Sequence, residues 1–191
     1  MTALAQTPVP EAHHLAPESR QYRQIPRYRM VLVIAAQHAL QPFSDLRNRR
    51  VHPPAKFLLQ FLQEILLRAV PPSHIVRTEQ PITCPDSEPE PDLSVVKGLK
   101  EDFRDEHPHT AELVIEICVS SHEYDRAKLR AYASAGVKES WLVLGPEKQI
   151  EVHRRPAGDQ FADRTVYGPG GRLSSATVPE FSVDLDALFA K

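Results

Sequence analysis

Two acidic residues and one lysine stand where their charges could support hydrolysis of a phosphodiester. Asp92 heads the apolar run DLSVV, Glu116 interrupts the apolar run ELVIEICV, and Lys128 lies in the next segment, HEYDRAKLRAYASAGV. Mg²⁺ and Mn²⁺ prefer oxygen ligands and usually keep water, so two carboxylates and a phosphate oxygen suffice to hold such an ion. The ion would polarise the phosphate and make its bound water more acidic. The pattern predicts metal-dependent cleavage of a nucleic acid, with Asp92 and Glu116 as metal ligands.

Glu116 is the sharpest anomaly, because the segment around it has the composition of a buried strand. Side chains alternate across a strand, so Glu116 shares its face with Val114 and Cys118. The opposite face carries the aliphatic residues Leu113, Ile115, Ile117 and Val119. A buried carboxylate is costly unless it is paired, hydrogen-bonded or bound to metal. Glu116 therefore needs either a metal ion or a buried Arg or Lys, and the sequence leaves both open.

Lys128 lies in a segment that predicts a helix, which Gly136 ends. Asp125, Lys128 and Tyr132 follow the spacing i, i+3 and i+7, which places them on one helix face. If that face covers the end of the Glu116 strand, the ammonium could reach the scissile phosphate or orient the water. The ordinary alternative for Asp125 and Lys128 is an exposed ion pair within the helix.

Composition bounds the class of protein. With 191 residues, 41% of them hydrophobic, the chain can form one domain with a sizeable core. The net charge of -2 excludes an overall cationic surface. No segment approaches the roughly 20 apolar residues that span a bilayer. Cys118 stands in an apolar run, which predicts a small buried thiol there rather than a disulfide with Cys84 and suits a reducing cytoplasm.

The pattern predicts a tail over residues 1–26 and one α/β domain over 27–191, with a mixed central sheet flanked by helices. An apolar run at 28–36 predicts a strand, and a basic cluster follows it at Arg47, Arg49 and Arg50. Pro53 and Pro54 open a helix that Pro71 ends. Further segments predict strands or a short closing helix; the strands are HIVRTE, PITC, DLSVV, ELVIEICV, WLVLG and QIEVHR, and the helix is VDLDALFA.

Several separate blocks, in order, resemble the Uma-type family of putative restriction endonucleases within the PD-(D/E)xK nuclease superfamily. They are PEPDLSVV, LVIEICVSS, YDRAKLRAYASAGVKESWLVL and QIEVHR followed by VPEFSVDLDALF. The resemblance runs from about Val51 to the C-terminus. It implies a restriction-endonuclease-like core and a Mg²⁺-dependent endodeoxyribonuclease. It also maps Asp92 onto the PD signature and Glu116 onto the second acid.

The chain departs from the superfamily's pattern at one place and from the family's pattern at another. The superfamily's Lys usually stands two residues after the second acid, where this chain has Cys118. The Uma-type family similarly has an apolar residue there and a Lys in the next helix, which corresponds to Lys128. The family usually carries an N-terminal block that reads like Glu-Leu-Ile-Asp-Gly-Glu and could supply another acid to the site. The corresponding segment here, YRMVLVIAAQHA, holds no carboxylate, and Glu64 or Glu79 could supply the missing acid instead. His52 matches a position where the family commonly has His.

Other functions have weaker support. A serine hydrolase would need Ser120 or Ser121 to pair with His122, but adjacent residues do not easily form a nucleophile–base pair. A zinc site at His107 and His109 lacks a second ligand cluster. The main alternative is a catalytically inactive nuclease-like scaffold that binds DNA or a partner protein. Unpaired edge strands would also permit a homodimer.

Overall fold

The computed structural model describes residues 53–119 and 122–190. The predicted tail at 1–26, the predicted strand at 28–36, His52 and the basic cluster Arg47, Arg49 and Arg50 lie outside the described residues. So do Ser120 and Ser121, on which the hydrolase alternative depends.

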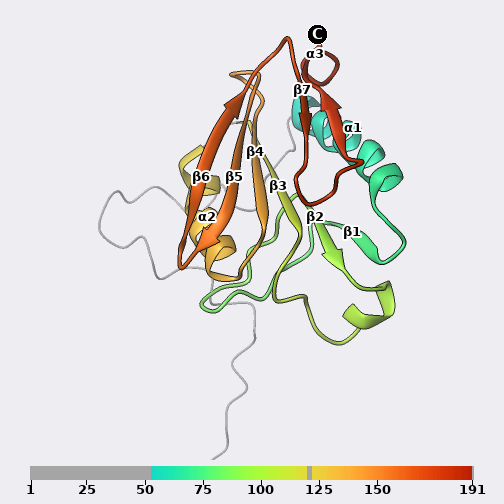
Figure 1. Ribbon diagram of the computed structural model, residues 1–191, viewed down its shortest axis with the longest axis vertical. Helices are drawn as coiled ribbons and strands as arrows, with labels where there is room; N and C mark the ends of the chain where they lie inside the picture. The colour runs from blue at the N-terminus through green and yellow to red at the C-terminus, as the bar shows by residue number, and fades with distance from the viewer. Residues whose placement is uncertain (1–52, 120–121, 191) are drawn as a thin grey trace, which may run out of the picture. The chain divides into compact units, whose positions relative to one another are not determined.

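A six-stranded sheet forms the centre of the described part of the chain, with its strands in sequence order from β1 to β6 (Figure 1). The strands are β1 (His74–Thr78), β2 (Leu93–Lys97), β3 (Leu113–Cys118), β4 (Glu139–Leu144), β5 (Gln149–Ala157) and β6 (Gln160–Tyr167). Neighbouring strands are antiparallel except β3 and β4, which are parallel. A parallel pair needs a crossover, which α2 (His122–Ser134) supplies. The sheet is therefore mixed, as predicted.

The larger apolar core lies on the face of the sheet that α1 (Pro53–Ala69) covers. Leu58, Leu62 and Leu66 recur at helical spacing and are buried against sheet residues such as Ile115. Three C-terminal elements complete this layer: β7 (Arg172–Ser174), β8 (Ser182–Asp184) and α3 (Leu185–Leu188). Figure 1 shows α1 and β7 together beside the sheet, apart from α2.

The opposite face of the sheet packs against α2 through smaller apolar groups. Val114 and Tyr132 belong to one of them, and Cys118, Leu142 and Leu144 form another. The predicted alternation along β3 is confirmed, since Leu113 and Ile115 lie in the α1-side core instead. Cys84 and Cys118 are both buried and free, which confirms that prediction as well. Polar side chains on the α2 side of the sheet are thus surrounded by fewer buried apolar residues than those on the α1 side.

Three local predictions differ from the structure. The segment PITC is irregular rather than a strand; Ile82 is buried there, and its N–H donates to the carbonyl of Pro89 at 3.0 Å. Strand β6 was not predicted, because most of its residues are exposed and its polar side chains obscure the pattern. The closing helix is shorter than predicted: Ser182–Asp184 form β8, and Asp184 caps α3 by accepting from the N–H of Ala187.

Across the described residues, no helix has both the length and the apolar character needed to cross a membrane.

Candidate functional site

The sheet brings the two predicted metal ligands to adjacent strands. The register pairs Leu93 of β2 with Ile115 of β3. Because the strands are antiparallel, the next positions in that register are Asp92 and Glu116. Asp92 stands just before β2, and its Oδ2 accepts a hydrogen bond from the N–H of Ile117 at 2.6 Å. This bond ties the carboxylate of Asp92 to the strand that carries Glu116.

Glu116 is 1% exposed, and side chains of α2 contact both oxygens of its carboxylate. The Nζ of Lys128 donates to Oε2 at 2.9 Å, and the hydroxyl of Tyr132 donates to Oε1 at 2.5 Å. The crossover from β3 through α2 to β4 places the helix over this face, so the predicted helix face does cover Glu116. The structure therefore brings Asp92, Glu116 and Lys128 together.

Lys128 also lies 3.7 Å from Asp125, with Nζ and Oδ1 as the closest atoms. The side chains of Lys128 and Asp125 are only 12% and 9% exposed, so this is not the exposed helical pair that was the ordinary alternative. The exposed ring of Tyr124 lies 5.3 Å from Nζ, within range of a cation–π contact. We call Asp92, Glu116, Asp125, Lys128 and Tyr132 the Glu116 cluster.

Burial and charge shift the ionisation of this cluster in defined directions. Burial raises the pKa of Glu116 to about 7, and the charge of Asp92 raises it too, while Lys128 and Tyr132 oppose the rise. Burial alone would lower the pKa of Lys128, but attraction to Glu116 and Asp125 raises it above its ordinary value. Burial and the nearby Glu116 carboxylate raise the pKa of Tyr132, so its hydroxyl stays protonated and donates. Lys128 is thus charged and Glu116 titrates near neutral pH.

The cluster fits a divalent cation as a site with two carboxylate ligands. Asp92 and Glu116 supply oxygen donors, and they are close enough for the charge of one to raise the pKa of the other. Within residues 53–119 and 122–190, no group of three or more His, Cys, Asp or Glu side chains is arranged to hold a metal ion. An ion held by Asp92 and Glu116 would therefore take its remaining ligands from water and substrate.

The other acidic and histidine candidates lie elsewhere. Glu64 is exposed on α1 and approaches Arg68 at 4.0 Å, so it does not compensate at the cluster. Glu79 is exposed, but its N–H donates to the carbonyl of Asp92 at 3.2 Å, which places its backbone beside the cluster. His107 and His109 line a separate hollow of about 250 Å³ between η2 (Lys100–Phe103) and β3.

Tyr132 is the member of the cluster whose role the sequence did not indicate. Its spacing from Lys128, one helical turn, was the available signal, and it predicted a shared face but no contact with Glu116. The contact depends on where the crossover sets α2 above β3, which the sequence of α2 alone does not specify.

A second buried carboxylate, Glu151 of β5, lies on the same face of the sheet. It accepts hydrogen bonds from Arg126 of α2 and from Arg164 of β6, and its Oε2 is 3.4 Å from Nε2 of His153. Hydrogen bonds from Arg164 and Arg126 lower the pKa of Glu151 to about 2, against the effect of burial. Burial lowers the pKa of His153, so its ring is neutral at pH 7. We call these four residues the Glu151 cluster.

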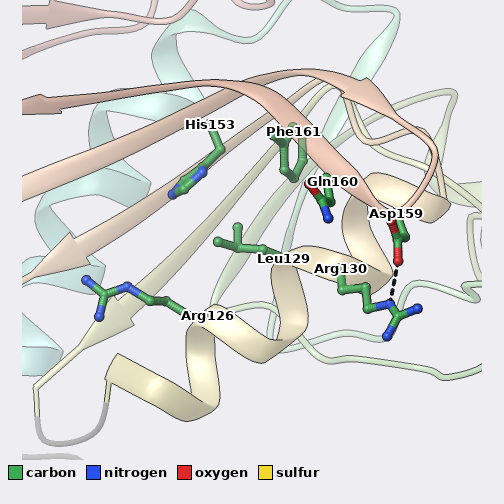
Figure 2. A pocket seen from close by; sticks show the side chains of 7 residues that line it. All are labelled: Arg126, Leu129, Arg130, His153, Asp159, Gln160 and Phe161. Carbon is green, nitrogen blue, oxygen red and sulfur yellow. Dashed lines mark ion pairs between the residues drawn. The ribbon is translucent and has the colours of Figure 1, made fainter.

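A hollow of about 360 Å³ borders the Glu151 cluster, between α2 and the β5–β6 turn (Figure 2). Figure 2 shows Arg130 of α2 reaching Asp159 of that turn, and the two form an ion pair at 2.8 Å. Asp92, Glu116 and Lys128 do not line this hollow. The hollow and the Glu116 cluster are therefore separate features on the α2 side of the sheet.

Comparisons with known proteins agree with this architecture. A family model described as "Uma2: Putative restriction endonuclease" matches residues 47–186. Among solved structures, a similar fold occurs in a chain described as a putative nuclease belonging to DUF820 from Anabaena variabilis ATCC 29413. The two chains are 17% identical with a TM-score of 0.63, over 73% of this chain and 82% of the other. No curated protein matches this chain. At this identity the structural likeness shows a shared fold.

Proposed function

The chain belongs to the Uma2 family, and on that premise we propose that it is a metal-dependent endodeoxyribonuclease. Asp92 and Glu116 would hold Mg²⁺ or Mn²⁺, and Lys128 would stabilise charge on the scissile phosphate. The observation that carries the proposal is the meeting of three elements around Glu116 of β3: Lys128 of α2 donates to its carboxylate at 2.9 Å, and Asp92, just before β2, accepts from the N–H of the neighbouring Ile117.

Asp92 and Lys128 would have different roles in the reaction. The N–H of Ile117 donates to Oδ2 of Asp92 and so holds this carboxylate beside Glu116, and the lone pairs of a carboxylate allow it to accept hydrogen bonds and bind an ion together. Lys128, kept charged by its carboxylate neighbours, places an ammonium where it can stabilise negative charge that develops on a phosphate. When bound, the ion supplies positive charge that polarises the phosphodiester and makes water more acidic. DNA would therefore approach the end of β3 that carries Glu116 and Ile117.

A catalytically inactive scaffold that binds DNA or a partner protein is the second candidate. One observation favours it: Lys128 and Tyr132 already satisfy both oxygens of Glu116, as they would in a structural ion pair. The two candidates differ in what they predict for metal ions, because a structural pair has no need of one.

The test is cleavage of linear and supercoiled DNA by the purified full chain with Mg²⁺, with Mn²⁺ and with a chelator. We expect cleavage only with metal, and a loss of roughly a hundredfold or more in Asp92→Asn and Glu116→Gln. Asp163→Asn is the matched control, because Asp163 pairs with Arg155 on the exposed part of the β5–β6 hairpin. This variant should cleave DNA as the wild type does. Intact DNA under every metal condition, with binding retained, would support the scaffold instead.

A further inference from the structure

We infer that Tyr132 is a positioning residue, whose hydroxyl holds the carboxylate of Glu116 in the orientation that receives the metal ion. The inference rests on the proposed function and assigns a role to a residue outside the predicted set of Asp92, Glu116 and Lys128. Tyr132 would not touch the ion or the DNA; it would act through Glu116.

The surroundings of Tyr132 leave its ring little freedom. The residue is 0% exposed and belongs to the apolar group that contains Ile82, Val114 and Val137. Its carbonyl accepts from the N–H of Val137 at 3.0 Å, in the turn that Gly136 closes at a φ of 70°. Both the ring and the backbone of Tyr132 are therefore fixed, and the hydroxyl presents a donor at one place on the α2 side of β3.

The hydrogen bond to Glu116 has the properties of an orienting contact. The hydroxyl donates to Oε1 while Lys128 donates to Oε2, so each carboxylate oxygen has its own donor. A carboxylate oxygen has two lone pairs, so Oε1 can accept from Tyr132 and still face an ion. Lys128 alone would leave the carboxylate free to rotate about its single contact. Groups that hydrogen-bond to a metal ligand fix its orientation, and their loss typically weakens metal binding or activity 10- to 100-fold.

The test is Mn²⁺ affinity, measured by electron paramagnetic resonance on the full chain with and without Tyr132→Phe. This change removes one oxygen atom and keeps the buried ring. We expect Mn²⁺ to bind roughly tenfold more weakly, with a matching fall in kcat for DNA cleavage and an unchanged KM. Tyr167→Phe is the matched control, because Tyr167 is half-buried on β6 and packs against the core on the α1 side of the sheet. It should bind Mn²⁺ like the wild type.

A second measurement separates positioning from general damage to the fold. In a Glu116→Gln background, Tyr132→Phe should weaken Mn²⁺ binding less than about twofold further, because Tyr132 acts through Glu116. In the wild-type chain, Mg²⁺ should shift the ¹³Cζ resonance of Tyr132 and leave that of Tyr167 in place. This readout needs no variant that might unfold.

The outcomes distinguish this inference from the proposed function. Equal Mn²⁺ affinity in the wild type and Tyr132→Phe, or an additive loss in the double variant, would overturn the role of Tyr132 alone. A chain that binds Mn²⁺ and responds to Tyr132→Phe but leaves DNA intact would keep this role and refute the nuclease. A chain that binds no Mn²⁺ would overturn both.

Discussion

Glu116 and Glu151 are buried carboxylates in one row of the sheet, yet they have opposite electrostatic surroundings. The register pairs Leu142 of β4 with both, so they lie on either side of it. Their exposed fractions are nearly equal, 1% and 2%. However, the pKa of Glu116 is raised to about 7, mainly by burial, whereas hydrogen bonds from Arg164 and Arg126 lower that of Glu151 to about 2. Similar burial therefore does not determine ionisation in this molecule.

The difference lies in how much positive charge each cluster contains. Glu151 has two guanidinium partners, Arg126 and Arg164, so its charge is more than balanced. Around Glu116, the carboxylates of Asp92 and Asp125 also lie close to the ammonium of Lys128. Among the five residues of the Glu116 cluster, three carboxylates lie around one ammonium, and an added cation would reduce the repulsion by which Asp92 raises the pKa of Glu116. A carboxylate whose pKa is raised by burial and a like charge is a candidate for a functional site, whereas a pKa lowered by ion pairs, as at Glu151, also occurs in structural networks.

The largest effect on stability should come from neutralising Glu151, and the same change at Glu116 should have no such cost. Glu151→Gln removes the anion between two guanidinium groups, and we expect it to cost about 2 kcal/mol; a fully buried pair would cost more, but Arg126 and Arg164 are 44% and 54% exposed. Glu116→Gln removes a charge that burial disfavours, so the metal-free chain should be equally stable or more stable. Urea unfolding at about pH 8 with a chelator measures both.

Each variant serves as the control for the other, because both replace a buried Glu with Gln at a residue that pairs with Leu142. If Glu116→Gln destabilises the chain as much as Glu151→Gln does, Glu116 is a structural ion pair, and the metal site loses its electrostatic basis.

The next prediction concerns Lys128 and Arg126, the basic partners of the two carboxylates, and how the stability cost of removing each depends on pH. Glu116 has a higher pKa in the folded chain than its ordinary value of 4.5, so the folded state binds more protons, and stability falls as pH rises from about 4.5 to about 7. Lys128→Met should therefore cost about 1–2 kcal/mol at pH 8, where Glu116 is ionised, and clearly less at pH 5.5, where it is neutral.

Arg126→Met provides the comparison for Lys128→Met. In this variant Glu151 keeps its hydrogen bond from Arg164. The lowered pKa of Glu151 leaves its carboxylate ionised at both pH 5.5 and pH 8. Its contribution to stability is lost only as pH falls from about 4.5 to about 2. The cost of Arg126→Met should therefore be the same at both pH values. A cost of Lys128→Met that does not change between pH 5.5 and pH 8 would contradict the raised pKa of Glu116.

The sequence predicted those parts of the fold that depend on local periodicity. Leu58, Leu62 and Leu66 indicated the buried face of α1, and the alternation along β3 set Glu116 apart from Ile115. The predicted family is confirmed, and so is the mixed sheet. These features follow from side chains a few residues apart, where backbone geometry fixes relative positions.

The contacts around Glu116 and Glu151 depend on long-range packing, which the periodicity of the sequence does not encode. Tyr132 meets Glu116 because the parallel pairing of β3 with β4 directs the crossover helix over one face. Glu151 is paired because α2 and β6 bring Arg126 and Arg164 to it from both directions in the sequence. Strand β6 itself was missed, so its partner residues could not be predicted either. The roles of Asp92, Glu116 and Lys128 in catalysis stay predictions.

The smallest effect should come from Arg130, one helical turn beyond Arg126 on α2. Arg130 pairs with Asp159 at 2.8 Å, but their side chains are 75% and 44% exposed, so water and salt screen the attraction. Arg130→Met should therefore cost less than about 0.5 kcal/mol, and added salt should reduce even that. Urea unfolding beside Arg126→Met compares two arginines of one helix that differ in the burial of their partners. If the two variants cost the same, burial of the Glu151 carboxylate adds nothing to its ion pairs, and the contrast with Glu116 would need another cause.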